Sequence, residues 1–87
     1  MFPDFIDGLR VYEYTDRGDY GAPKCCLAAC GAEPSAYLVI GQYDGDHLYI
    51  LLWCGKEKNI LFDWTYPTVE ACKAVCPDAR WHRKETL

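Results

Sequence analysis

The clearest pattern in the chain is a pair of β-rich segments, residues 35–43 and 47–54, on either side of Asp44-Gly45. Asp-Gly between two apolar runs is a strong hairpin signal. The sequence therefore predicts a central hairpin over residues 35–54. A loop with an odd number of residues would gather aliphatic side chains on one face and aromatic ones on the other, and we prefer that register.

Weaker patterns predict the remaining elements. Residues 9–15, 60–64 and 79–83 have strand character. Apolar residues within 2–9 are spaced for one turn of helix, with Gly8 as its C-cap. Thr68 is placed as the N-cap of a helix over about 69–76, which Pro77 ends. The segment 23–30 fits a short helix or a strand.

Together these elements predict an α+β fold. We expect a small antiparallel sheet of about four to five strands, with the helix at 69–76 packed on one face. A second short helix near 23–30 is added if the helical alternative holds there. The length of 87 residues fits a single domain over 1–87.

Composition and charge narrow the function classes. Half of the residues are hydrophobic, which argues against disorder. The net charge of −4 argues against direct nucleic-acid binding, because phosphate neutralisation needs clustered Lys and Arg. The longest apolar run is too short to cross a membrane, and the sequence shows no targeting pattern. We therefore expect a cytoplasmic protein with reduced thiols.

The chain has six cysteines, and four of them form two pairs with the same spacing. Cysteines four apart on a helix project from the same side. Cys26, Cys30, Cys72 and Cys76 could therefore hold one structural zinc ion if both segments are helical. A secreted domain stapled by disulfides is a second alternative. We prefer a third, in which the thiols are reduced and pack as small hydrophobic groups.

No motif for catalysis is present. His47 and His82 are the only histidines and Ser35 is the only serine, and none of them lies in a recognisable catalytic pattern. A phosphate-binding glycine loop is also lacking. We predict a protein that is not an enzyme and needs no cofactor.

Aromatic side chains on the hairpin give the best indication of function. With an odd loop, four large aromatic groups share one face, next to two carboxylates in the turn. Aromatic groups with a polar tip are common at protein interfaces. The same face could instead close a homodimer or lie under another segment of the chain. The predicted partner-binding residues are Tyr37, Tyr43, Tyr49, Trp53, Asp44 and Asp46.

The combined expectation is a small acidic module that binds another protein as an inhibitor or adaptor. Its size and composition are similar to those of small phage- or mobile-element-encoded inhibitors of host defence, including anti-CRISPR proteins. If the target is a nucleic-acid-handling complex, the acidic residues would occupy its basic groove.

Overall fold

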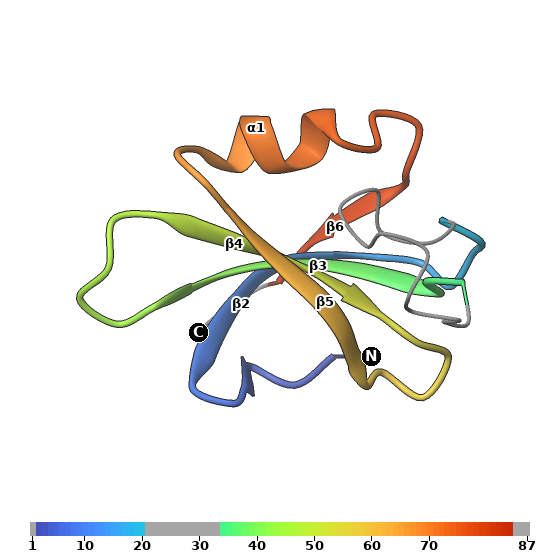
Figure 1. Cartoon of the computed structure of the whole chain (residues 1–87), viewed down its shortest axis with the longest axis horizontal. Coiled ribbons are helices and arrows are strands. Elements are labelled where there is room, and N and C mark those ends of the chain that lie inside the picture. The colour runs from blue at the N-terminus through green and yellow to red at the C-terminus, as the bar shows by residue number, and fades with distance from the viewer. Residues whose placement is uncertain (1, 21–33, 85–87) are drawn as a thin grey trace.

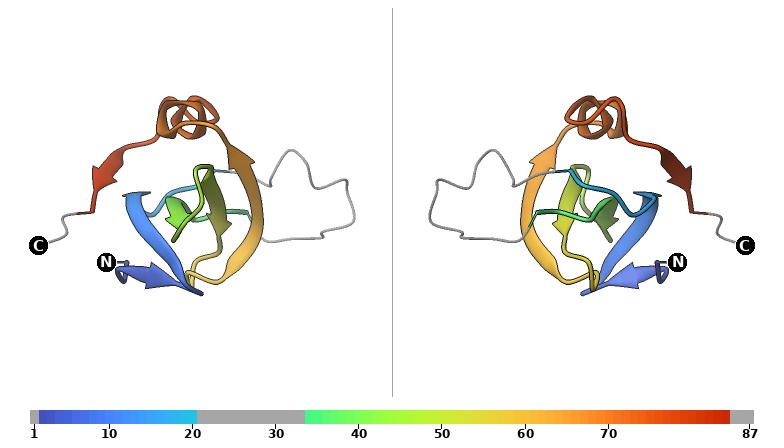
Figure 2. Two further views of the ribbon diagram at one scale, coloured as in Figure 1. Left: turned by 90° about the vertical axis from the view of Figure 1, so that its left-hand side faces the viewer. Right: turned by 90° about the vertical axis from the view of Figure 1, so that its right-hand side faces the viewer.

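The computed structural model describes residues 2–20 and 34–84, and a curled antiparallel sheet makes up most of this part (Figure 1). The strands follow the order β1-β2-β3-β4-β5, and β6 pairs with the same edge of β2 as β1. Figure 2 shows the curl, with α1 lying across one side of it. The elements are β1 (Phe5–Ile6), β2 (Leu9–Thr15), β3 (Tyr37–Tyr43), β4 (Tyr49–Cys54), β5 (Ile60–Tyr66), α1 (Val69–Ala74) and β6 (Trp81–Arg83).

The predicted fold class is confirmed only in its coarse form. The described residues contain six strands, which exceeds the four to five expected, and their single helix is a minor element. The predicted second helix near 23–30 falls outside the described residues. In the part of the chain that the structure describes, no helix is long and apolar enough to span a membrane.

The predicted register of the central hairpin is wrong. Gly41 pairs with Ile50 and Leu38 pairs with Trp53, so an even number of residues lies between the members of each pair. Tyr37, which precedes Leu38, therefore lies on the opposite face from Trp53. The aromatic residues of the hairpin are divided between the two faces.

The register is explained by burial of the central strands on both faces. Residues 38–40 and 50–53 are continuous apolar runs, which are typical of strands covered on both sides. Because each face has its own cover, the aliphatic residues need not segregate to one of them. The helix-side cluster contains Leu38, Ile40, Leu51, Trp53 and Cys72, and the far-side cluster contains Phe2, Leu9, Val11, Val39, Leu52 and Cys54.

Helix α1 begins as the sequence predicts. The Thr68 hydroxyl accepts a hydrogen bond from the backbone N–H of Ala71 at 3.0 Å, which satisfies one of the free donors of the first turn. The helix ends at Ala74, two residues before the predicted Cys76, because the backbone N–H of Cys76 bonds to the Lys73 carbonyl three residues back at 3.1 Å. Lys73 Nζ also lies 2.6 Å from a Glu13 carboxylate oxygen, which ties the helix to β2.

The N-terminus forms a hairpin instead of the predicted helical turn. Asp7 and Gly8 have φ angles of 48° and 84° and connect β1 to β2. Positive φ at both positions of a two-residue loop is the type I′ turn that Asp-Gly favours. A bulge then interrupts β2, because the pairing with β3 passes from Val11 to Glu13 and leaves Tyr12 as the extra residue.

Candidate functional site

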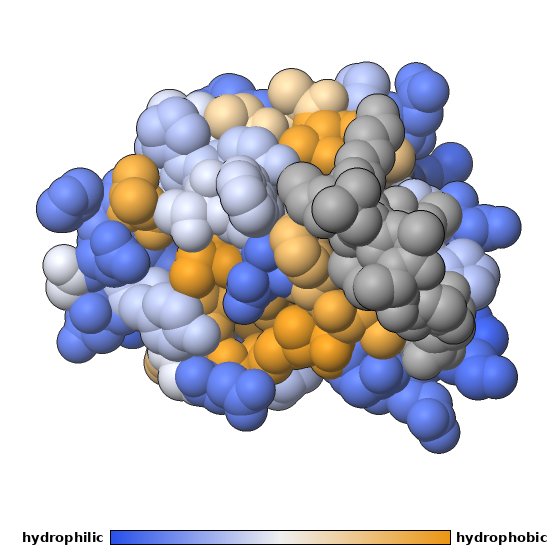
Figure 3. Space-filling view, viewed as in Figure 1, coloured by the Kyte–Doolittle hydropathy of each residue, from blue (hydrophilic) through white to orange (hydrophobic). Residues whose placement is uncertain are grey.

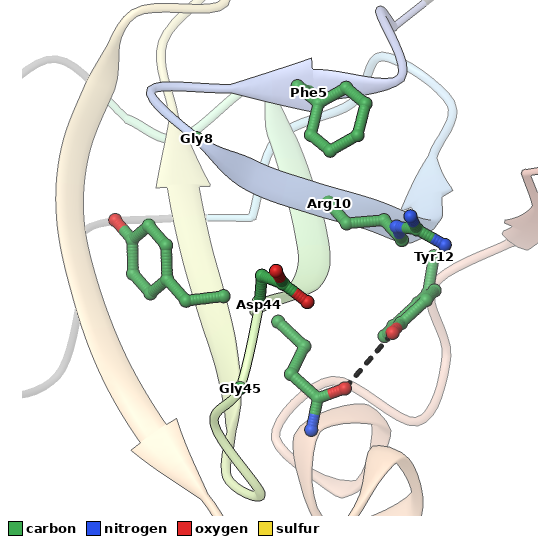
Figure 4. Close-up of a pocket in the computed structure, with 8 residues that line it drawn as sticks. Phe5, Gly8, Arg10, Tyr12, Asp44 and Gly45 are labelled. Atoms are coloured by element: carbon green, nitrogen blue, oxygen red, sulfur yellow. Dashed lines mark hydrogen bonds between the residues drawn. The ribbon is translucent and has the colours of Figure 1, made fainter.

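A pocket of about 320 Å³ lies where the β1–β2 turn meets the β3–β4 hairpin (Figure 4). The two turns are neighbours because Leu9, which follows the first turn, pairs with Tyr43, which precedes the second. Gly45 has a φ of 83°, a left-handed conformation that glycine adopts without strain. The pocket is lined by Phe5, Gly8, Arg10, Tyr12, Gln42, Tyr43, Asp44 and Gly45.

Arg10 supplies the positive charge of this pocket. Its guanidinium carbon lies 5.7 Å from the centre of the Phe5 ring, in a cation–π contact that follows from the pairing of Phe5 with Arg10. Among the described residues, Arg10 forms no ion pair, and the Phe5 ring is 54% exposed. The N–H groups of the guanidinium are therefore available to a carboxylate or another acceptor.

Polar groups of β2 and β3 form the adjoining wall. The Tyr12 hydroxyl donates a hydrogen bond of 3.0 Å to Oε1 of Gln42, so the amide nitrogen of Gln42 remains a donor for a ligand. The Tyr12 ring also lies 6.0 Å from the ring of Tyr49 between centroids. Arg10 and Tyr12 are two residues apart in β2, so the alternation of side chains along the strand places both on the same side.

Two of the six predicted partner-binding residues line the pocket. Tyr43 is 42% exposed, and the exposed Asp44 brings a carboxylate to the same pocket as Arg10. Asp46 is exposed in the same turn, where its carboxylate accepts a 3.2 Å hydrogen bond from the backbone N–H of Leu48. Tyr49 is half-buried and reaches the pocket wall through its contact with Tyr12.

The other two predicted residues lie in the core, on different faces. Tyr37 is half-buried, with its ring edge against Phe2 at a centroid distance of 5.1 Å. Trp53 is 5% exposed and packs 5.5 Å from Phe62. The structure therefore does not assemble the single aromatic face that the odd-loop register predicted.

Phe5, Arg10 and Gln42 were missed by the sequence reasoning. The signal for the first two was present, because Asp7-Gly8 is the same dipeptide that marks the central hairpin. The assignment of Gly8 as a helix C-cap hid that signal. Gln42 lies next to Arg10 only through the pairing of β2 with β3, which a single sequence does not mark.

A second exposed surface follows β5. Phe62 and Trp64 are stacked with ring centroids 6.0 Å apart and planes 14° apart, and Trp64 is 51% exposed. A groove of about 410 Å³ is lined by Phe62, Asp63, Trp64 and Thr65. Figure 3 shows hydrophobic surface gathered along the course of β5, interrupted by hydrophilic atoms.

Three cysteines belong to the described residues, and all three are free thiols: Cys54, Cys72 and Cys76. Within this part of the chain, no group of His, Cys, Asp and Glu is arranged to hold a metal. The predicted zinc ligands Cys26 and Cys30 lie outside the described residues, so the zinc alternative stays a prediction.

Burial distinguishes these thiols chemically. Burial raises the pKa of Cys54 from 9.0 to about 12 and that of Cys72 to about 11, where the charge of Glu70 adds to the rise and a backbone hydrogen bond opposes it. Because the thiolate is the nucleophile, iodoacetamide at about pH 8 should modify the half-buried Cys76 at least about 100 times faster than either buried thiol. Peptide mapping by mass spectrometry measures this, and equal rates for the three would contradict the burial.

The same raised pKa values predict the direction of alkaline destabilisation. The folded state holds these protons more tightly than the unfolded chain, whose thiols titrate near 9.0. The stability that they contribute is therefore present below about pH 9 and lost as the pH rises toward 11–12.

Comparisons of the chain with protein-family models, with characterised proteins and with solved structures gave no match. The function is therefore inferred from the geometry of the two surfaces.

Proposed function

We propose that this protein is a small, non-enzymatic, cytoplasmic interaction module that binds another protein and acts as an inhibitor or adaptor. The observation that carries the proposal is the Arg10 guanidinium, which contacts the exposed Phe5 ring and has no ion-pair partner among the described residues. Arginine and aromatic residues dominate the binding energy of many protein interfaces.

The chemistry of the pocket specifies what the partner presents to it. A guanidinium binds a carboxylate with two parallel hydrogen bonds, so an Asp, a Glu or a chain-terminal carboxylate suits Arg10. An apolar group beside that carboxylate would cover the Phe5 ring. Asp44, which also lines the pocket, suits a Lys or Arg of the same partner segment.

The acidic character of the chain supports an inhibitory role. The net charge is −4, and Asp44 and Asp46 are both exposed in the β3–β4 turn. If the target is a nucleic-acid-handling complex, these carboxylates would approach its basic groove, as in a small defence inhibitor of the anti-CRISPR kind. Binding of that type weakens as salt screens the charges.

Site-specific photo-crosslinking in the native host tests the proposal. A photoreactive amino acid replaces Tyr43 at the pocket, or the exposed loop residue Asp78 as a matched control. We expect a covalent adduct with one protein from position 43, and none from position 78. Adding Arg10→Glu should remove the adduct, whereas Arg80→Glu makes the same charge change outside the pocket and should retain it. An adduct that forms equally from both positions, or that survives Arg10→Glu, would argue against the pocket as the interface.

A further inference from the structure

Strand β5 is the last strand of the sheet formed by the described residues. It pairs with β4 on one side, and no described strand pairs with its other side. Residues 60–65 of this strand therefore present a row of backbone N–H and C=O groups next to exposed side chains. Ile60 is 39% exposed, and Trp64 is more exposed still. An edge of this kind is a template for another strand.

Side chains along this edge alternate in character between the two faces. Trp64 pairs with Leu51 and Phe62 pairs with Trp53, so both aromatic rings lie on the helix side of the sheet. Asp63, between them, pairs with Leu52 and lies on the far side, where it is exposed. A strand added to β5 would therefore meet an apolar surface at two alternate positions and a carboxylate at the position between them.

Charge selects the occupant of this edge. Asp63 is the middle residue of β5, so a second copy pairing symmetrically through β5 would bring two Asp63 carboxylates directly opposite each other. Like charges in directly opposed positions destabilise a strand pair, whereas opposite charges stabilise it. The acidic chain as a whole also opposes self-association.

We propose that β5 accepts an extended segment of a partner protein as an added strand, with a Lys or Arg facing Asp63 and apolar residues facing Phe62 and Trp64. Backbone hydrogen bonds to the open edge hold the segment, and the apolar–basic–apolar pattern gives it specificity. This surface is built from different strands than the Arg10 pocket. A module with both surfaces could bridge two segments of one target or two different proteins.

Fluorescence anisotropy with short labelled peptides tests this proposal directly. The probe is Ser-Thr-Val-Lys-Val-Thr-Ser, and the matched probe has Glu in place of Lys. We expect saturable binding of the Lys peptide, weakened at least about tenfold by Asp63→Lys, and a preference of the Asp63→Lys variant for the Glu peptide. The control variants Asp46→Lys and Arg10→Glu should bind the Lys peptide as the unmodified protein does, which separates this surface from the pocket.

Backbone pairing is tested by N-methylation of the Lys peptide. Alternate amides of an added strand point toward β5 and away from it. Methylation of the amides that point toward β5 should abolish binding. Methylation of the amides that point away should change the dissociation constant by less than about threefold. Equal effects of the two sets would overturn strand addition. Absence of saturable binding, or binding that Asp63→Lys leaves unchanged, would overturn the proposal. Analytical ultracentrifugation tests for self-association. If it shows a dimer that Trp64→Ala dissociates, the strand added to β5 comes from a second copy of this chain and not from a partner protein, which would overturn the proposal.

Discussion

Replacing Trp53 with alanine should lower the free energy of unfolding by about 3–5 kcal/mol. The indole is 5% exposed, pairs across the hairpin with Leu38 and packs 5.5 Å from the ring of Phe62. Truncation would remove the largest side chain of the helix-side cluster and leave a cavity under α1. A small domain has a total stability of only about 5–15 kcal/mol, so the variant should be close to unfolding at physiological temperature.

Trp64→Ala is the matched control, since the same residue type is 51% exposed on the neighbouring strand. It should cost about 0.5–1.5 kcal/mol, mostly through its stacking on Phe62. Urea denaturation followed by circular dichroism measures both values. Equal losses in the two variants would contradict the placement of Trp53 in the core. A loss of partner binding in Trp53→Ala would report unfolding and not an interface contact.

Gly41→Ala is expected to destabilise the protein by about 1–3 kcal/mol through overpacking. A Cβ at this position would lie 2.5 Å from the Arg10 carbonyl oxygen and 2.7 Å from Cγ of Leu9. The carbonyl belongs to the paired backbone of β2, so it cannot move away without breaking the pairing of Arg10 with Gln42. A loss of this size should lower the thermal midpoint by roughly 4–8 °C for each kcal/mol.

The control for this variant is Gly45→Asn in the exposed β3–β4 turn. No atom lies within 4 Å of a Cβ at Gly45, and asparagine tolerates its positive φ better than most residues. We expect a change of about 0.5 kcal/mol or less in the free energy of unfolding. A Gly41→Ala variant as stable as Gly45→Asn would show that β2 and β3 approach each other less closely than the structure indicates.

Local signals in the sequence were sufficient for most elements. Asp44-Gly45 marked the central hairpin, Thr68 marked the start of α1, and the apolar residues near Trp81 indicated the last strand. The hairpin turn and the start of α1 depend on interactions among residues close in sequence, such as the hydrogen bond from Ala71 to Thr68, whereas the partner of β6 is the distant strand β2. A single sequence therefore carries enough information to place them.

Long-range relations were harder to predict. The register of the hairpin depends on which faces are covered, and the cover comes from distant residues such as Phe2 and Cys72. The apolar run at 38–40 could have indicated two buried faces, but the preference for segregated side chains outweighed it. The pocket was predicted only in part for the same reason. Tyr43 and Asp44 belong to the hairpin itself, whereas Arg10 reaches them only through the pairing of β2 with β3.

Titration calorimetry of the purified protein with the partner that photo-crosslinking identifies tests the central claim most directly. That claim is that Arg10 binds a carboxylate of another protein. Arg10→Glu should weaken the affinity by about 10- to 100-fold, the loss expected for hydrogen bonds to a charged group, while Arg80→Glu should change it less than about threefold. The thermal midpoint of Arg80→Glu should match that of the unmodified protein. That of Arg10→Glu should fall by no more than about 4–8 °C, because the exposed Arg10 forms no ion pair with a described residue and loses only its cation–π contact with Phe5. An affinity that Arg10→Glu leaves unchanged, or that Arg80→Glu lowers equally, would contradict the account.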